Sequence, residues 1–212
     1  GDVSALLQWA WQNPVPQGNA LLDAAFIDTN AGTAVGQGGT IVRTTDGGAT
    51  WVTQDSGTKG TLYSVSFVDA DIGTAVGWDG TIVRTTDGGG TWVAQDSGTT
   101  EPLYGVCFID SNTGTAVGGS GTIAHTADGG VTWVTQDSGT AEPLYSVSCT
   151  DANTGTAVGG STILRTTDGG TNWVAQDSGA TSFLVGVSFA DANTGTVVGG
   201  NGTILRTNDT GG

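Results

Sequence analysis

TTDGGATW, at Thr44–Trp51, decides the fold, because the same pattern returns along the whole chain. It recurs as TTDGGGTW at Thr85–Trp92, TADGGVTW at Thr126–Trp133 and TTDGGTNW at Thr166–Trp173, and a fifth copy begins as TNDTGG at Thr207. The aspartates of the five copies are 40 or 41 residues apart: Asp46, Asp87, Asp128, Asp168 and Asp209. A fixed period of this length is typical of repeat architectures such as propellers.

Each period contains four short segments with β-strand character. In the second period they are Leu62–Asp69, Gly73–Gly77, Thr81–Thr86 and Thr91–Asp96. The residues between them are rich in Gly and Asp, which tolerate positive φ and close antiparallel hairpins. Four antiparallel strands in about 40 residues form one blade of a β-propeller. We therefore predict an all-β propeller and a single domain over residues 1–212. A parallel β-helix, with shorter coils and no hairpin turns, is the less favoured alternative.

The two ends of the chain predict a closed ring of five four-stranded blades. The last unit has three predicted strands, at Leu184–Ala190, Thr196–Gly199 and Thr203–Asn208. The segment Leu6–Gln12 is a spare strand, and its Trp11 lies 40 residues before Trp51. We predict that this segment completes the last blade, which avoids leaving open sheet edges. The repeated tryptophans are then Trp11, Trp51, Trp92, Trp133 and Trp173.

The composition excludes several classes of partner. The formal net charge is −15, with 5 Lys and Arg against 20 Asp and Glu. Binding of nucleic acid needs a Lys/Arg surface that such a chain lacks, and anionic membranes are disfavoured for the same reason. No apolar stretch reaches the ~20 residues of a membrane-spanning helix, and no signal peptide is recognised. We expect a monomer that neither binds nucleic acid nor inserts into a membrane.

The two cysteines occupy different positions of neighbouring repeats. Cys107 stands where the second unit has Ser66, and Cys149 where it has Phe67. Because adjacent positions of a strand face opposite sides, we expect no bridge between them. Both are interpreted as small buried side chains.

The repeated pattern Ser/Thr-x-Asp-x-Gly-x-Thr-Trp resembles the Asp-box, or BNR repeat, of sialidases and other propellers. Its aspartate is expected to accept backbone N–H bonds within the turn, and its tryptophan to lie between blades. The alternative is a set of five acidic functional sites. The stretch Trp11–Trp51 also resembles the photosystem II assembly/stability factor-like family. That resemblance implies a propeller that binds a client protein without catalysis, in an exported, periplasmic or lumenal compartment.

A second acidic motif precedes the second strand of each unit. It reads Asp28-Thr-Asn-Ala-Gly in the first unit and recurs at Asp69, Asp110, Asp151 and Asp191. It looks like half of a calcium loop, without the glutamate at position twelve or the flanking helices of an EF-hand. We interpret it as a hairpin turn, with calcium as the alternative, and we predict no metal and no cofactor.

We expect no catalysis. Glu101 and Glu142 are the only glutamates and occupy equivalent loops one blade apart, whereas glycoside hydrolysis needs two carboxylates about 5–10 Å apart in distinct environments. A lone histidine, His125, cannot build a metal site with thiols on other strands. A sialidase-like hydrolase is therefore the least favoured function.

One repeat position forms a possible cationic ring: Arg43, Arg84, His125, Arg165 and Arg206. These side chains are expected to stack on the repeated tryptophans or to pair with Asp55, Asp96, Asp137 and Asp177. The alternative is a ring of cations that grips an acidic segment.

Differences between the blades point to a binding surface. The loops between second and third strands, and those between blades, vary and should share the face opposite the Asp-box turns. Variable loops on a uniform scaffold usually carry specificity. The candidate contacts are Trp78, Asp79, Gln37, Ser120, Ser161 and Asn201. The favoured function is binding of a protein or peptide on this loop face, and the alternative is a lectin with repeated weak glycan sites.

Overall fold

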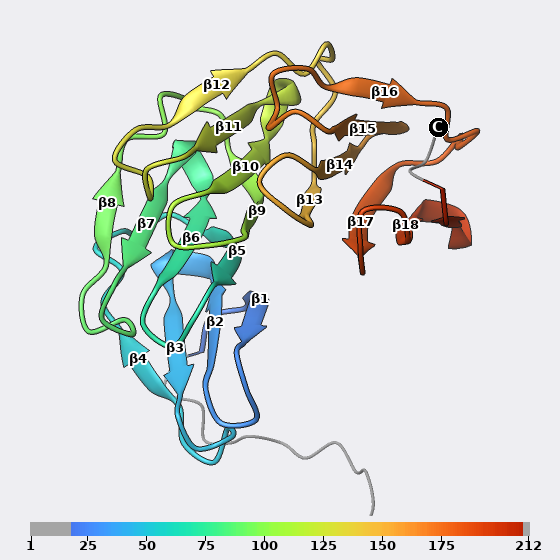
Figure 1. Cartoon of the computed structure of the whole chain (residues 1–212). Helices are drawn as coiled ribbons and strands as arrows, with labels where there is room; N and C mark the ends of the chain where they lie inside the picture. Colours follow the sequence, from blue (N-terminus) through green and yellow to red (C-terminus); the bar gives the residue numbers. More distant parts are fainter. Residues whose placement is uncertain (1–17, 210–212) are drawn as a thin grey trace, which may run out of the picture.

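The computed structural model describes residues 18–209, which form five antiparallel β-sheets arranged along an arc (Figure 1). We call the sheets blades 1 to 5 in chain order. Blades 1 to 4 have four strands each and blade 5 has three, and within every blade the strands follow one another in sequence order. The predicted all-β fold with four-stranded antiparallel blades is confirmed. Across the described part of the chain, no helix is long and apolar enough to cross a membrane.

The strand bounds repeat from blade to blade. Blade 1 consists of β1 (Leu21–Phe26), β2 (Gly32–Gly36), β3 (Ile41–Thr44) and β4 (Val52–Gln54). Blade 2 consists of β5 (Leu62–Phe67), β6 (Gly73–Gly77), β7 (Ile82–Thr85) and β8 (Val93–Gln95). Blade 3 consists of β9 (Leu103–Phe108), β10 (Gly114–Gly118), β11 (Ile123–Thr126) and β12 (Val134–Gln136). Blade 4 consists of β13 (Ser146–Cys149), β14 (Gly155–Gly159), β15 (Thr162–Thr166) and β16 (Val174–Gln176). Blade 5 consists of β17 (Leu184–Phe189), β18 (Gly195–Gly199) and β19 (Ile204–Thr207).

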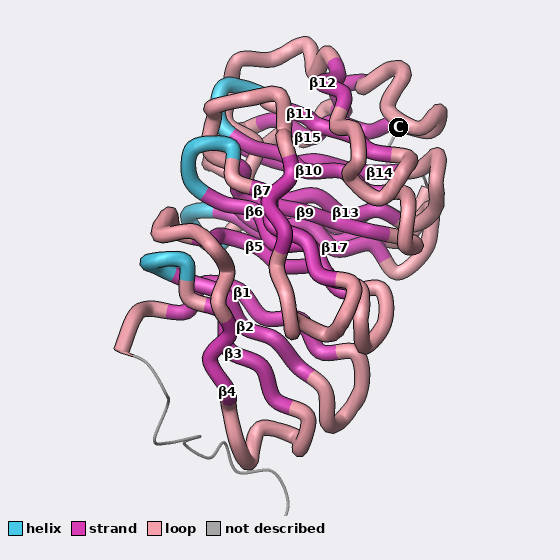
Figure 2. The backbone as a smooth tube through the Cα atoms, turned by 90° about the vertical axis from the view of Figure 1, so that its left-hand side faces the viewer, coloured by secondary structure: helices cyan, strands magenta, loops and turns pink. Residues whose placement is uncertain are grey.

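Short 3-10 turns follow the second strand in four blades. They are η1 (Gln37–Gly39), η2 (Trp78–Gly80), η3 (Gly119–Gly121) and η4 (Gly200–Gly202). Figure 2 shows these turns, in cyan, along one side of the molecule.

The first strand of each blade lies on the concave side of the arc (Figure 1). These innermost strands contact one another in the order β1, β5, β9, β13, β17, and blades 1 and 5 stand at the two ends of the arc. The predicted closing strand Leu6–Gln12, with Trp11, lies outside the described residues.

The hydrophobic core lies between blades rather than within one sheet. The cluster between blades 1 and 2 joins Val35 and Ile41 to Leu62 and Ala75, and these four side chains are fully buried. Equivalent clusters fill the next three interfaces. Each inner blade is therefore covered on both faces, which explains why its second strand reads GTAVG: the neighbouring sheets leave room only for small side chains.

The Asp-box aspartate holds its own turn, as the sequence predicts. Asp46 accepts hydrogen bonds from the Thr50 N–H at 2.8 Å, the Thr50 hydroxyl at 2.7 Å and the Thr44 hydroxyl at 2.8 Å. These bonds stabilise the ionised form and lower the pKa of Asp46. The same network lowers the pKa of Asp128 to about 2. The glycine after the aspartate adopts positive φ, +71° at Gly47, which fits the turn chemistry expected there.

Three of the five Asp-box tryptophans, Trp92, Trp133 and Trp173, lie between blades, as predicted. The Trp92 indole donates to Gln54 Oε1 of the preceding blade at 3.1 Å. The same bond joins Trp133 to Gln95 at 3.2 Å and Trp173 to Gln136 at 2.9 Å. Each bond spans two consecutive blades, so the repeated tryptophan fixes how one sheet sits against the next.

The second acidic motif also forms a turn. Asp28 Oδ1 accepts the N–H groups of Asn30 at 2.7 Å and Ala31 at 2.8 Å. The Asn30 carbonyl then accepts the Gly47 N–H at 2.9 Å. The two acidic turns of a blade therefore pack together at one edge of the sheet. This geometry agrees with the hairpin-turn interpretation.

Candidate functional site

The variable loops share one edge of the blades, opposite the acidic turns. In blade 2 the Trp78 N–H donates to the carbonyl of Thr61 in the preceding inter-blade loop, at 2.8 Å. The Gly119 N–H makes the equivalent bond to the Pro102 carbonyl at 2.8 Å. We call this edge, with its 3-10 turns and inter-blade loops, the loop face. It matches the face predicted from the sequence.

All six candidate contacts are exposed on the loop face: Gln37, Trp78, Asp79, Ser120, Ser161 and Asn201. Trp78 is the largest, with 56% of its surface exposed. The residue after it, Asp79, occupies the left-handed region at φ +57°, as do its counterparts Ser120 and Asn201. Short polar side chains tolerate this conformation, so the turn places a polar group at each tip.

A stack of three tyrosines lies where the innermost strands begin, next to the loop face. The rings of Tyr63 and Tyr104 are 5.4 Å apart between centroids and meet edge to face at 63°, and those of Tyr104 and Tyr145 are 5.5 Å apart and tilted by 39°. Each tyrosine follows the buried leucine that opens its blade, as in Leu62–Tyr63. Sequence reasoning missed this stack, although the recurring Leu-Tyr pair in three successive units was a visible signal.

Two glutamates lie at the same edge as the tyrosine stack. A Cβ atom at Gly119 would meet Glu101 Oε2 at 2.7 Å, and one at Gly160 would meet Glu142 Oε2 at 3.1 Å. Each carboxylate therefore lies over the second-to-third strand turn of its own blade. Burial first, then Tyr63, Tyr145 and Glu101, raise the pKa of the Tyr104 hydroxyl. The Glu101 carboxylate is therefore close enough to Tyr104 to influence the ionisation of its hydroxyl.

Arginines of the repeated position join neighbouring blades. Arg43 donates from Nη1 to Thr33 Oγ1 at 3.0 Å and from Nη2 to the Ala70 carbonyl of blade 2 at 2.6 Å. Its guanidinium lies 5.2 Å from the centre of the Phe67 ring. The same contacts recur for Arg84 with Thr74, Ser111 and Phe108, and for Arg165 with Thr156, Ala192 and Phe189.

These partners differ from those expected from the sequence. The guanidinium groups contact phenylalanine rings and turn carbonyls of the next blade, instead of the repeated tryptophans or the Asp55 series. Asp55 accepts the Gly57 N–H of its own loop at 2.9 Å, at the opposite edge of the blade. Arg43, Arg84 and Arg165 are buried, and Arg206 is exposed at the end of the arc.

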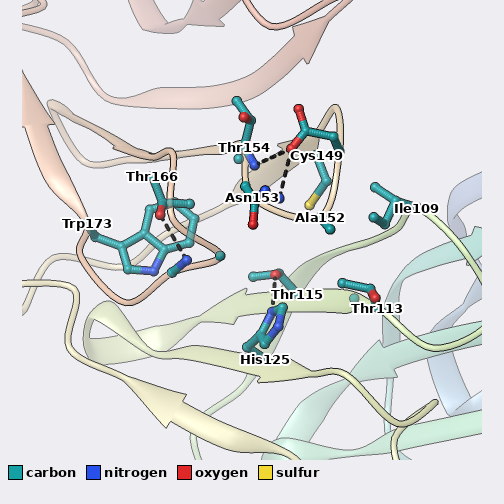
Figure 3. A pocket seen from close by; sticks show the side chains of 15 residues that line it. Ile109, Thr113, Thr115, His125, Cys149, Ala152, Asn153, Thr154, Thr166 and Trp173 are labelled. Carbon is teal, nitrogen blue, oxygen red and sulfur yellow. Dashed lines mark hydrogen bonds between the residues drawn. The ribbon is translucent and has the colours of Figure 1, made fainter.

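The interface of blades 3 and 4 departs from this scheme, because His125 replaces the arginine. His125 Nδ1 is 3.1 Å from Thr115 Oγ1, and burial lowers the pKa of its imidazole. A cavity of about 20 Å³ remains between His125, Thr113 and the turn at Asp151–Thr154 (Figure 3). The imidazole is too short to fill the space that a guanidinium takes at the other interfaces.

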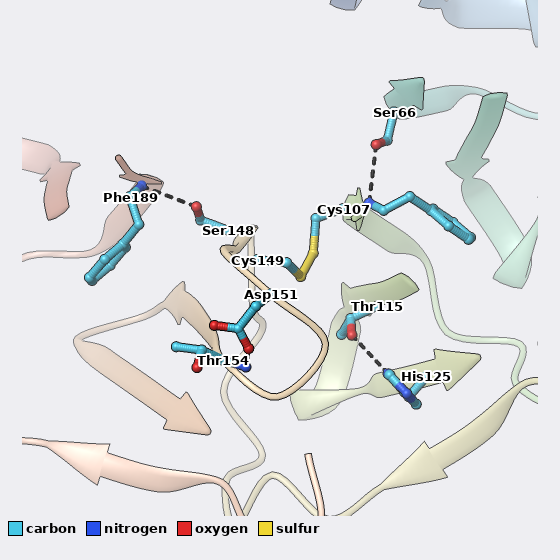
Figure 4. The surroundings of a disulfide bond; sticks show 10 residues. Ser66, Cys107, Thr115, His125, Ser148, Cys149, Asp151, Thr154 and Phe189 are labelled. Carbon is cyan, nitrogen blue, oxygen red and sulfur yellow. Dashed lines mark hydrogen bonds between the residues drawn. A yellow bond between two sulfur atoms is a disulfide. The ribbon is translucent and has the colours of Figure 1, made fainter. Parts of the chain in front are cut away.

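The same interface contains a disulfide between Cys107 and Cys149, with a Cα–Cα distance of 6.0 Å (Figure 4). The expectation that these cysteines stay unbridged is therefore wrong. Strand alternation applies within one sheet, whereas these residues belong to the innermost strands of two blades. At the equivalent position Ser66 Oγ accepts the Phe108 N–H of the next blade at 3.2 Å. The Ser position thus points at the Phe position of the following blade, and two cysteines there face each other.

Comparison with known proteins finds a matching family and solved structures with the same fold. The family model for photosynthesis system II assembly factor YCF48 matches residues 3–92 and 91–177. The structure of YCF48 bound to D1 peptide is 24% identical, with a TM-score of 0.72, and the match covers 91% of this chain and 64% of that chain. YCF48 from Cyanidioschyzon merolae is 20% identical, with a TM-score of 0.64 and coverage of 93% and 85%.

Two other solved structures share the fold. The Niastella koreensis GH74 enzyme is 18% identical, with a TM-score of 0.68 and coverage of 87% of this chain and 35% of that chain. The WD40 β-propeller domain of Doa1 is 16% identical, with a TM-score of 0.73 and coverage of 92% and 67%. A search among curated proteins gives no match.

Proposed function

The chain belongs to the photosynthesis system II assembly factor YCF48 family, and on this premise we propose that it is a non-catalytic scaffold that binds a segment of a client protein on its loop face. The observation that carries the proposal is the exposure of two large aromatic side chains at that edge, one in blade 2 and one in the loop before blade 5. Trp78 is 56% exposed and Phe183 is 60% exposed. Aromatic side chains are enriched at protein interfaces and among the residues that dominate their binding energy.

A binding role is supported by a structural relative that holds a peptide. That relative is YCF48 bound to D1 peptide. This chain spans 64% of the length of that protein, so the identity of its own client is part of the proposal. The GH74 likeness shows the fold alone.

The absence of catalysis is likewise proposed from the arrangement of the carboxylates. Glu101 and Glu142 occupy equivalent positions of blades 3 and 4, so they lack the two distinct environments that an acid and a nucleophile or base require. The Asp-box and Asp28-type aspartates are occupied in their own turns. In residues 18–209 no three His, Cys, Asp or Glu side chains are grouped so as to hold a metal.

We propose that Leu6–Gln12 supplies the fourth strand of blade 5 and closes a five-bladed ring. A pocket of about 190 Å³ lies between blades 4 and 5, lined by Gln176, Phe189, Val197 and Leu205 among others. Their counterparts in blades 1 and 2 surround Trp92. Gln176 occupies the position whose side chain accepts a tryptophan N–H in blades 1 to 3, and its amide instead donates to the Val174 carbonyl at 3.3 Å. The pocket therefore has the lining of a tryptophan site.

The faces at the ends of the arc support closure. Ile204 is 73% exposed, whereas its counterparts Ile41 and Ile82 are buried. Phe26 is 55% exposed, and its counterpart Phe67 lies under the arginine of the preceding blade. Closure would bring Arg206 to Phe26. We expect Trp11→Ala to lower the thermal midpoint and Trp9→Ala to leave it unchanged. Equal behaviour of the two variants would contradict the proposed register.

We further propose an exported, periplasmic or lumenal location. It is supported by the Cys107–Cys149 disulfide, because disulfides persist in oxidising compartments and are rare in the cytosol.

The client-binding proposal is tested with a labelled D1 peptide and an array of unrelated 15-residue peptides, measured by fluorescence anisotropy. We expect Trp78→Ala to weaken binding at least tenfold, since an exposed aromatic anchor is the type of residue that dominates interfaces. Val131→Ala is the matched control, because Val131 is 83% exposed on the opposite, Asp-box edge. Binding of no peptide, equal effects of the two variants, or binding of glycans in place of peptides would overturn the proposal.

A further inference from the structure

We propose that Tyr63, Tyr104 and Tyr145, together with Glu101 and Glu142, form a site for lysine and arginine side chains of an extended basic peptide. This inference rests on the proposed client-binding function and specifies the chemistry of the client. The tyrosines belong to the starts of blades 2, 3 and 4, on the concave side of the arc where β5 and β9 lie (Figure 1).

The tyrosine rings are not core residues. The leucine before each one is fully buried, while Tyr63 and Tyr104 are half-buried and Tyr145 is 37% exposed. In residues 18–209 no hydrogen bond joins a protein group to any of the three hydroxyls. Buried tyrosine hydroxyls usually find a partner. Rings that meet edge to face or at a tilt, and whose hydroxyls have no protein partner among the described residues, present both a π surface and polar ends.

The spacing of the rings fits an extended chain. Successive centroids are 5.4 and 5.5 Å apart. In a strand, side chains on one face recur about every 6.6 Å. Cationic groups at alternate positions of an extended peptide can therefore approach neighbouring rings. A guanidinium or ammonium within about 6 Å of a tyrosine centroid is attracted by the ring quadrupole.

Charge selects a cationic occupant over a merely apolar one. The whole chain carries a net charge of −15, and Glu101 and Glu142 stand two residues before Leu103 and Leu144, beside the stack. Glu101 acts on the Tyr104 hydroxyl, and Glu142 occupies the equivalent position over the turn of blade 4, so each of these two blades offers a carboxylate to a bound cation. Within residues 18–209, Lys59, which is exposed in the loop before blade 2, is the one lysine or arginine of this edge, and it lies at the Tyr63 end. The acidic part of the site is therefore on blades 3 and 4.

The test uses the full chain and two labelled probes, a peptide of alternating Arg and Thr and a matched peptide of alternating Glu and Thr. We expect the basic peptide to bind and the acidic peptide not to bind. Tyr104→Leu/Tyr145→Leu should weaken binding about tenfold, because two cation–π contacts are lost. Tyr104→Phe/Tyr145→Phe, which keeps the rings, should stay within about threefold. Glu101→Gln/Glu142→Gln should weaken binding and flatten its dependence on salt.

The outcomes separate this inference from the proposed function. Equal binding of the two probes, full binding by the leucine variant, or an unchanged salt dependence in the glutamine variant would overturn it. If Trp78→Ala weakens D1 peptide binding while the tyrosine variants do not, the loop-face function stands and the basic-peptide site fails. Thermal midpoints of all variants establish that each is folded, and the phenylalanine variant distinguishes loss of the ring from loss of the hydroxyl.

Discussion

Removing the Cys107–Cys149 disulfide between blades 3 and 4 should show how much of the stability of this interface depends on the covalent bond. The disulfide joins residues 42 positions apart. Closing a loop of this length in the unfolded chain corresponds to about 4 kcal/mol at 25 °C in the chain-entropy description. For a chain of this size, this corresponds to a fall of about 8–16 °C in the thermal midpoint. We expect that fall in Cys107→Ser/Cys149→Ser, followed by circular dichroism.

A matched variant tests the reason for the loss. Cys107→Ser/His125→Arg/Cys149→Phe rebuilds the contacts that Arg84 makes with the turn and the phenylalanine ring of the next blade. Hydrogen bonds to a charged group contribute about 1.5–3 kcal/mol each, offset by burial of the guanidinium. The free energy of unfolding of the triple variant should therefore exceed that of the double variant by about 2 kcal/mol. This free energy should not change when a reductant is added. The reasoning would be refuted if a reductant left the thermal midpoint of the wild type unchanged, or if the double variant were as stable as the wild type.

Three further outcomes follow from single contacts. The pKa of Asp128 is lowered to about 2, so the ionised carboxylate stabilises the folded state. This contribution to stability should be complete above pH ~4, the pKa of an unfolded aspartate, and should be lost as the pH falls towards 2. The thermal midpoints of wild type and Asp128→Asn should therefore converge near pH 2. Gly80→Ala should destabilise more than Gly57→Ala, because both have positive φ but only a Cβ at Gly80 meets the Thr99 carbonyl, at 2.0 Å; equal urea midpoints would contradict this. Trp92→Ala should cost about 3–5 kcal/mol, measured by urea unfolding, and a loss below 1 kcal/mol would show that the indole does not fix the blade interface.

The sequence determined the blade because the forces that shape it are local. The Asp46 turn closes through bonds to residues two and four positions away, so the motif carries its own geometry. The strands predicted in the second unit match β5 to β8 within about two residues at each end, and Gly73–Gly77 matches fully. The repeat also located the loop face, since a strand's direction fixes which of its ends meets which turn.

The tertiary structure decided what faces what across the blades. The Arg43 contact with the Ala70 carbonyl joins residues 27 apart, and the Cys107–Cys149 bridge spans 42. Such contacts depend on the angle and offset between two sheets that share no backbone hydrogen-bond ladder. The alternation of side chains along one strand carries no information about that offset. For this reason the sequence alone predicted no bridge between the cysteines and assigned the arginines to other partners. The tyrosine stack arises in the same way, because repeated residues become neighbours only once the blades are packed side by side.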